Sequence, residues 1–383
     1  MKLKLSTTFL TTLLFVAPAF AASPIKIGVP IGLSGANSVV APSAIQAAEL
    51  AVAQINATGG VLGRPLKLVI ADDQSGAAGA QAAFDSLIFQ KNVDVIISME
   101  TSAARNAGLP AVTKGDIPYI YTAFYEGGAC NPNLFVDGWV PQQQVPPVVN
   151  YFMQHLHAKK FFLIGSDYAF GRGMLNFASD YIKKSGGAVV GEEFLPLGAS
   201  DWTAIISKLQ ASGADAIITS TAGGAPNVTL TKQLAASGVK LPYGNLALDE
   251  GTAKMIGPVA KGIYISASYL TNIDSPENKT FLAAMKAKFG KNLYTPNDLS
   301  VPEYEGIYLY KEAVEKAKTT DTAKVDKALG EVAFDGPRGN ISMDKEHHAA
   351  LTMYLGQVQS NGDVEVVAKF PNVSPENQCP SLQ

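Results

Sequence analysis

The sequence has 383 residues, with 30 basic and 33 acidic side chains and a formal net charge of −3. This mildly acidic balance, without any block of basic residues, excludes the usual kind of nucleic-acid-binding protein, and we expect no nucleic-acid partner. After the N-terminus, no run reaches the ~20 apolar residues of a membrane span.

The N-terminus has the pattern of a secretory signal peptide at residues 1–21. Lys2 and Lys4 precede an apolar run, and Ala19-Phe20-Ala21 is an A-x-A cleavage site. We therefore expect cleavage after Ala21 and a soluble, exported protein. The remaining chain, about 360 residues, exceeds what one hydrophobic core usually supports, and this length predicts two lobes.

The first part of the chain alternates strands and helices. Short apolar runs predict strands buried on both faces, and the Ala-rich or periodic segments between them predict helices. The expected strands are Ile25–Ile31, Leu66–Ala71, Val93–Ser98 and Pro118–Ala123, and the expected helices are Pro42–Asn56, Gly79–Gln90 and Ala103–Lys114. This alternation predicts a doubly wound parallel sheet with right-handed crossovers.

The same order of elements starts again after a Pro-rich helix that begins at Pro141 and ends near His157. The expected strands are Phe161–Gly165, Ala188–Phe194, Ala216–Ser220, Tyr243–Ala247 and Gly262–Ala267. The expected helices are Phe177–Ser185, Trp202–Ser212, Val228–Ser237, Pro276–Phe289, Glu303–Lys318 and Thr322–Glu331. A closing β meander is expected at Gly336–Ser342, Leu351–Val358 and Val364–Lys369, followed by an irregular tail. The fold class is therefore α/β, with two parallel-sheet lobes.

Polar side chains follow two strands of the first lobe, at Met99–Ser102 and Thr122–Glu126. In open parallel sheets, ligands bind at the carboxyl ends of strands. Thr101 and Ser102 stand just before an expected helix, whose N-terminus favours an anion such as a carboxylate. Alternatively, these two residues only cap that helix.

A zwitterionic ligand would also need a carboxylate for its ammonium group and apolar walls for its side chain. Glu250, Asp249 and Glu100 are the candidate carboxylates, although a glutamate after a strand is more often a solvated loop charge. The candidate walls, for which core packing is the alternative, are Tyr121, Tyr125, Tyr168 and Phe170.

Several stretches together resemble the periplasmic solute-binding proteins of ABC transporters for branched-chain amino acids. They are INATGGVLGRPL, TAFYEGGACNPNLF, FFLIGSDYAFGRG, EEFLPLG and GPRGNISMDKEHH. The resemblance covers essentially the whole mature chain and looks closest to the urea- and short-chain-amide-binding branch. It implies a periplasmic monomer that is not an enzyme and needs no cofactor. Such a protein holds a small solute between two lobes and delivers it to a membrane permease.

The resemblance also implies lobe boundaries and a hinge of three crossing segments, near Pro141, Ser266–Ser268 and Met343–Ala349. Lobe 1 is expected to comprise residues 22–141 and 268–345, lobe 2 residues 142–267 and 346–370, and the C-terminal tail residues 371–383.

Site residues carry over from this family one by one. Ser102 matches a ligand-binding serine after the third strand, and Tyr168 matches a cleft tyrosine of the second lobe. Tyr121 and Ala123 stand where the amide branch has a tyrosine and a threonine. Glu250 matches the glutamate that takes the ammonium group of an amino-acid ligand.

Three positions depart from the family pattern. Glu100 and Phe170 each stand where the amide branch has a tyrosine, and Ala225-Pro226 stands where the leucine-binding branch has one. An amino acid, urea, or a simple amide is therefore expected as the solute, with its identity open. A ligand-sensing module would use the same pocket, and a hydrolase would need a nucleophile–base pair that the sequence does not show.

The remaining reactive side chains predict a disulfide and no metal site. Cys130 and Cys379 both lie in Pro/Asn-rich loops of an exported chain, where pairing is permitted, although they could also be two unrelated thiols. Adjacent His347 and His348 would point to opposite faces of a strand, and we expect a surface pair rather than metal ligands.

Overall fold

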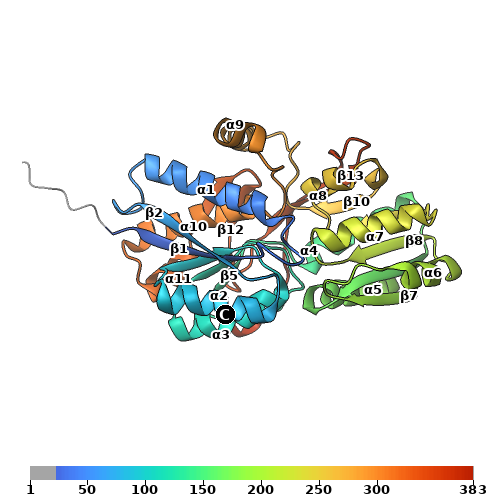
Figure 1. Ribbon diagram of the computed structural model, residues 1–383, viewed down its shortest axis with the longest axis horizontal. Coiled ribbons are helices and arrows are strands. Elements are labelled where there is room, and N and C mark those ends of the chain that lie inside the picture. The colour runs from blue at the N-terminus through green and yellow to red at the C-terminus, as the bar shows by residue number, and fades with distance from the viewer. Residues whose placement is uncertain (1–22, 383) are drawn as a thin grey trace, which may run out of the picture.

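The computed structural model describes residues 23–382, so the expected signal peptide lies outside the described residues. The chain forms two α/β lobes side by side, each built on its own sheet (Figure 1). Below, lobe 1 is the part built on the first sheet and lobe 2 the part built on the second. The α/β fold with two doubly wound lobes is confirmed.

Lobe 1 contains a five-stranded parallel sheet in the order β2-β1-β3-β4-β5. Its strands are β1 (Ile25–Ile31), β2 (Leu66–Asp72), β3 (Val95–Ser98), β4 (Tyr119–Tyr121) and β5 (Leu134–Val136). The helices of this lobe are α1 (Ala41–Ala57), α2 (Ala77–Asp85), α3 (Ser102–Gly115), α9 (Pro276–Phe289), α10 (Val301–Ala317) and α11 (Thr322–Leu329). Strand β3 is buried throughout, as its uninterrupted apolar run predicts.

Lobe 2 contains a seven-stranded sheet in the order β14-β13-β10-β9-β8-β6-β7. Its parallel strands are β6 (Lys160–Asp167), β7 (Ala188–Pro196), β8 (Ala216–Ser220), β9 (Tyr243–Asn245) and β10 (Tyr264–Ala267). The antiparallel pair β13 (Leu351–Val358) and β14 (Val364–Val373) extends the sheet beyond β10. The helices are α4 (Pro141–His155), α5 (Ala169–Lys184), α6 (Thr203–Ala211), α7 (Ala225–Ala236) and α8 (Glu250–Ile256).

The elements differ from the expectation in four places. Strand β5 and helix α8 were not expected, because three and seven residues carry too short a pattern to show a period. The first strand of the expected meander is a separate hairpin of β11 (Ala333–Gly336) and β12 (Gly339–Ser342). Helix α5 begins at Ala169, where glycines in its first turns suggested a loop.

The disulfide Cys130–Cys379 is confirmed, with the two Cα atoms 5.4 Å apart. It attaches the C-terminal segment to the loop that follows β4. The backbone N–H of Gly128 donates to the Gln378 side chain at 3.1 Å, and the N–H of Cys379 donates to Glu346 at 2.5 Å. The end of the chain is thus fixed beside the loop that leads toward the crossing segments.

The chain passes between the lobes three times: between β5 and α4, after β10, and between β12 and β13. These passages coincide with the expected hinge, and the exact lobe boundaries stay a prediction.

A buried ion network joins two of the passages. The Arg338 guanidinium group donates to the carboxylate of Glu305, to Asp137 after β5, and to the Ser268 hydroxyl after β10. The Ser268 hydroxyl in turn donates to Asp298 at 2.5 Å.

Arg338 is the cation of this network, and its side chain and those of Asp137 and Glu305 have no exposed surface. Replacing it by alanine leaves Glu305 and Asp137 buried without the cation that both of them face, which costs about 3–5 kcal/mol. We therefore expect Arg338→Ala to lower the free energy of unfolding by that amount in chemical denaturation.

The matched control is Arg172→Ala, which removes an exposed arginine from its 2.6 Å ion pair with Asp167. An exposed pair contributes about 0–1 kcal/mol, so this variant should unfold almost as the parent does. Equal losses in the two variants would contradict the role given to the buried network.

Candidate functional site

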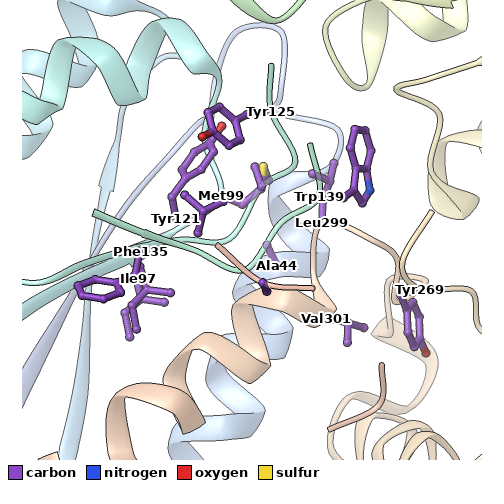
Figure 2. Close-up of a cluster of buried hydrophobic side chains, with 14 of the residues drawn as sticks. Ala44, Ile97, Met99, Tyr121, Tyr125, Phe135, Trp139, Tyr269, Leu299 and Val301 are labelled. Carbon is purple, nitrogen blue, oxygen red and sulfur yellow. The ribbon is translucent and has the colours of Figure 1, made fainter. Parts of the chain in front are cut away.

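A small cavity lies between the lobes, at the carboxyl ends of strands from both sheets. The free space inside it is about 20 Å³, which is roughly what one water molecule needs. The lining residues are Asn37, Met99, Glu100, Thr101, Ser102, Tyr121, Ala123, Phe124, Tyr168, Phe170, Gly223 and Leu299. Figure 2 shows Met99, Tyr121 and Leu299 in the buried cluster around this place, with Met99 between the other two. The position is the one expected for ligands of doubly wound sheets.

Seven of the nine predicted site residues line this cavity. They are Glu100, Thr101, Ser102, Tyr121, Ala123, Tyr168 and Phe170. The prediction missed Asn37, Met99, Phe124, Gly223 and Leu299. Asn37 and Gly223 follow β1 and β8, so the rule that ligands bind at strand ends could have found them. Leu299 comes from the segment before α10 and carried no local signal.

The two predicted residues outside the cavity lining have other contacts. The Tyr125 hydroxyl lies 2.6 Å from Nε2 of His348. The carboxylate of Glu250 accepts hydrogen bonds from the backbone N–H and the hydroxyl of Thr271, at 2.7 and 2.9 Å. Burial raises the pKa of Glu250 to about 7, against the opposing effect of these two bonds. Its role toward a ligand ammonium group stays a prediction.

A surface position was expected for His347 and His348, but neither histidine lies on the surface. His348 is 1% exposed and contacts Tyr125, and the ring of His347 stacks on Phe135 with centroids 3.9 Å apart. Burial lowers the pKa of both histidines. Both therefore help to fix the third crossing segment.

Between residues 23 and 382, no group of three or more His, Cys, Asp or Glu side chains has the arrangement of a metal site.

The N-terminus of α3 forms one wall of the cavity. The Thr101 hydroxyl accepts a hydrogen bond from the N–H of Ala104 at 3.1 Å, so Thr101 caps the helix as one of the two readings proposed. The Ser102 hydroxyl donates to Glu126 at 2.5 Å. The first N–H groups of a helix have no partner within it and favour anions. A wall made by Thr101 and Ser102 is therefore suited to a ligand carboxylate.

Glu100 is the most unusual residue of the lining. It is 2% exposed, and neither of its carboxylate oxygens has a hydrogen-bond partner. The nearby hydroxyl of Ser98 donates to the carbonyl oxygen of Pro30 instead. Burial, then the carboxylates of Asp73 and Glu303, raise the pKa of Glu100 well above its usual range, and Arg105 only partly offsets them.

Among residues 23–382, no basic side chain lines the cavity. Arg105 is near Glu100, but its guanidinium group pairs with Glu126 at 2.7 Å and lies over the rings of Tyr121 and Tyr125, at 5.0 and 4.5 Å. Buried carboxylates without a cation are costly unless they hold a proton or meet a positive charge. Burial therefore disfavours the charged form of Glu100 when no cation is beside it, and a cationic ligand group would favour that form.

Lobe 2 completes the cavity with aromatic side chains. The rings of Phe124 from lobe 1 and Phe170 from α5 are 5.5 Å apart, and Phe170 also contacts Tyr168. The close approach needs a glycine on α5, because a Cβ at Gly173 would lie 2.5 Å from the Cβ of Glu126. The lobes thus face each other in a closed arrangement around the cavity.

Two α/β lobes that close on a small cavity at their strand ends define a solute-trapping protein. The chain belongs to the periplasmic binding protein family, whose model matches residues 24–363. Among curated relatives, Leu/Ile/Val-binding protein homolog 6 of Brucella melitensis is 24% identical over 380 residues, covering 94% of each chain. The family expected from the sequence is confirmed, and the urea- and amide-binding branch is not.

Solved structures show the same fold. One is a solute-binding protein of an ABC transporter from R. palustris in complex with benzoate. Its TM-score is 0.83 and its identity 20%, with 93% of this chain and 99% of that chain covered. Another is the branched-chain amino acid transporter substrate-binding protein LivJ from Streptococcus pneumoniae in complex with isoleucine. Its TM-score is 0.79 and its identity 26%, with 91% and 99% covered. Within residues 23–382, no helix combines the length and apolarity that crossing a membrane requires.

The buried carboxyl groups predict a pH dependence of stability. Burial raises the pKa of Glu303 and of Asp137 to about 8 each, whereas unfolded carboxyl groups titrate near about 4. Between these values the folded protein binds more protons, so lowering the pH stabilises it. We expect the free energy of unfolding to rise as the pH falls from about 8.5 to about 7.5, above the range in which unfolded histidines gain most of their protons.

Chemical denaturation across this range measures the slope, and Glu303→Gln is the control that removes one titrating group. The variant should show a shallower dependence. A free energy of unfolding that rises with pH in the parent protein would be the contrary result.

Proposed function

We propose that the protein is the solute-capturing component of an ABC transporter, which holds an amino acid in the interlobe cavity and delivers it to a membrane permease. Family membership supports the transport role, and the cavity supports the class of solute. The protein acts in the periplasm as a monomer, without catalysis or a cofactor.

The unpaired carboxylate of Glu100 is the observation that carries this proposal. A ligand ammonium group would give it the counter-charge that no lining side chain supplies, in a charge-assisted bond. The N-terminus of α3 begins two residues further on, at Ser102, and offers N–H donors to the ligand carboxylate. The aromatic walls would then take an apolar ligand side chain.

An aromatic carboxylic acid is the second candidate. Four aromatic side chains line the cavity, namely Tyr121, Phe124, Tyr168 and Phe170, and the R. palustris neighbour is in complex with benzoate. Such a ligand has a carboxylate for α3 but no cation for Glu100, which would have to keep its proton. Urea and simple amides also lack the cation. The charge at Glu100 therefore separates an amino acid from the other solutes.

Glu100→Gln tests the assignment, with L-isoleucine, L-leucine, benzoate and acetamide as the titrated compounds in calorimetry. If Glu100 pairs with an ammonium group, the variant should lose about 2–5 kcal/mol of amino-acid binding, because a desolvated charge pair is broken. Binding of benzoate or acetamide should be unchanged or improved, since glutamine is neutral and of the same shape.

Glu250→Gln is the matched control, a second buried glutamate whose carboxylate binds Thr271 outside the cavity. It should leave affinity nearly unchanged. A loss confined to Glu250→Gln would move the ammonium site to Glu250, as the resemblance implied. Binding of benzoate alone, by every variant, would favour the aromatic acid.

The transport output has its own test, because a sensing module would use the same cavity. Uptake of the bound solute should disappear when the protein is deleted from its host and return when it is restored. Unchanged uptake would favour sensing.

A further inference from the structure

A second contact between the lobes lies outside the solute cavity, at Asn297. This residue precedes α10 in lobe 1 and is 2% exposed. Its Nδ2 group donates to Oδ1 of Asp249 at 2.9 Å. Asp249 follows β9 and caps α8 in lobe 2. Neither residue lines the solute cavity, so this hydrogen bond joins the lobes without involving a solute.

The two ends of the Asn297 amide have separate roles. Its Oδ1 atom accepts hydrogen bonds from the N–H groups of Leu299 and Ser300, at 3.0 and 3.1 Å, and so shapes the turn that leads into α10. Its Nδ2 group reaches across to lobe 2. Within lobe 1, Nδ2 also contacts the Ser43 hydroxyl at 3.3 Å and the Thr295 carbonyl oxygen at 3.4 Å, both longer than the bond to Asp249. One substitution can therefore remove the bridge and keep the turn.

Asp249 depends on this donor. Its carboxylate is 3% exposed and also accepts from the N–H and the hydroxyl of Thr252, on its own helix. A buried carboxylate gains from each donor, and hydrogen bonds to charged groups are stronger than neutral ones. The facing position on α8 is Gly251, where a Cβ would come within 3.5 Å of Nδ2 of Asn297. Both residues also line a pocket that is separate from the solute cavity, so the contact joins the lobes at the edge of the interface and exists only while they are together.

We propose that the Asn297–Asp249 hydrogen bond is a latch that holds the lobes closed independently of the solute. Separation of the lobes breaks it and returns both groups to water. Any interaction present only in the closed form shifts the open–closed equilibrium toward closure, and raises the apparent affinity for every solute that binds the closed form. Asn297 is accordingly a positioning residue for binding, whatever the solute is.

Asn297→Asp tests the latch with minimal change. Aspartate keeps the oxygen that accepts from Leu299 and Ser300, and replaces the donor by an oxygen that faces the carboxylate of Asp249. The closed-to-open ratio should fall on the order of tenfold or more, as expected for loss of a hydrogen bond to a charged group. The measurement is small-angle scattering of the protein as purified, without added ligand, in which the variant should show a larger radius of gyration than the parent.

Ser43→Ala is the control, because it removes a contact of Asn297 within lobe 1, together with the bond from the Ser43 hydroxyl to the Val40 carbonyl oxygen, and leaves the bond to Asp249 in place. This variant should scatter as the parent does. Asn297→Ser is the second variant if Asn297→Asp folds poorly. Serine can still cap the turn but is too short to reach Asp249, and it should expand the molecule in the same direction. Thermal unfolding is recorded for all variants. A purely structural role would lower the unfolding temperature and leave the radius unchanged, and equal radii in the folded parent and Asn297 variants would overturn the latch.

Discussion

Burial of carboxylates, and what neutralises each of them, is the constraint on which this structure depends. Where the chain passes between the lobes, Asp137 and Glu305 are buried completely, and the Arg338 guanidinium group lies against both. Because that cation bonds to segments from β5, β10 and α10, neutralising the charges also fixes how the crossing segments meet. Removing one partner of a buried ion network destabilises the fold far more than replacing the whole network by apolar side chains does. The buried network therefore holds the crossing segments together at the place where the two lobes meet.

In the cavity, one buried carboxylate has no cation to neutralise it. Glu100 is buried as deeply as the hinge carboxylates, but the one arginine beside it, Arg105, is already paired with Glu126. Glu303 also has no cation beside it within residues 23–382, but it accepts a hydrogen bond from the Thr122 hydroxyl at 2.6 Å and does not line the cavity. Glu100 does line the cavity, so a positive charge that arrives with a solute can reach its carboxylate. The same cavity offers a helix N-terminus at Ser102 and aromatic walls, so the charges and shape together match a zwitterion. This is the link between the energetics of the fold and the proposed capture of an amino acid.

Sequence patterns predicted long helices and strands well. They predicted short elements, and contacts between residues far apart in the sequence, poorly. The strands Ile25–Ile31 and Ala216–Ser220 have the expected bounds, because each is an apolar run between turn signals. Leu134–Val136 is too short to show a period. Strand ends located most of the cavity, since parallel strands bring them to one edge. Leu299 was not among the predicted residues and Tyr125 does not line the cavity, because tertiary packing alone decides which side chain turns toward it. That Glu100 lacks a partner could not be read from the sequence, since it depends on where Arg105 points.

The central claim is that Glu100 gives up its proton to pair with a ligand cation. Native mass spectrometry of the purified protein identifies a bound solute, and calorimetry of the stripped protein with that solute, in buffers of different ionisation enthalpy at neutral pH, counts the protons exchanged. Because the pKa of Glu100 is raised well above its usual range until a cation lies beside it, binding should release about one proton per solute, and this release should vanish in Glu100→Gln. An observed enthalpy that does not depend on the buffer, for a solute bound tightly by the parent protein, would contradict the account.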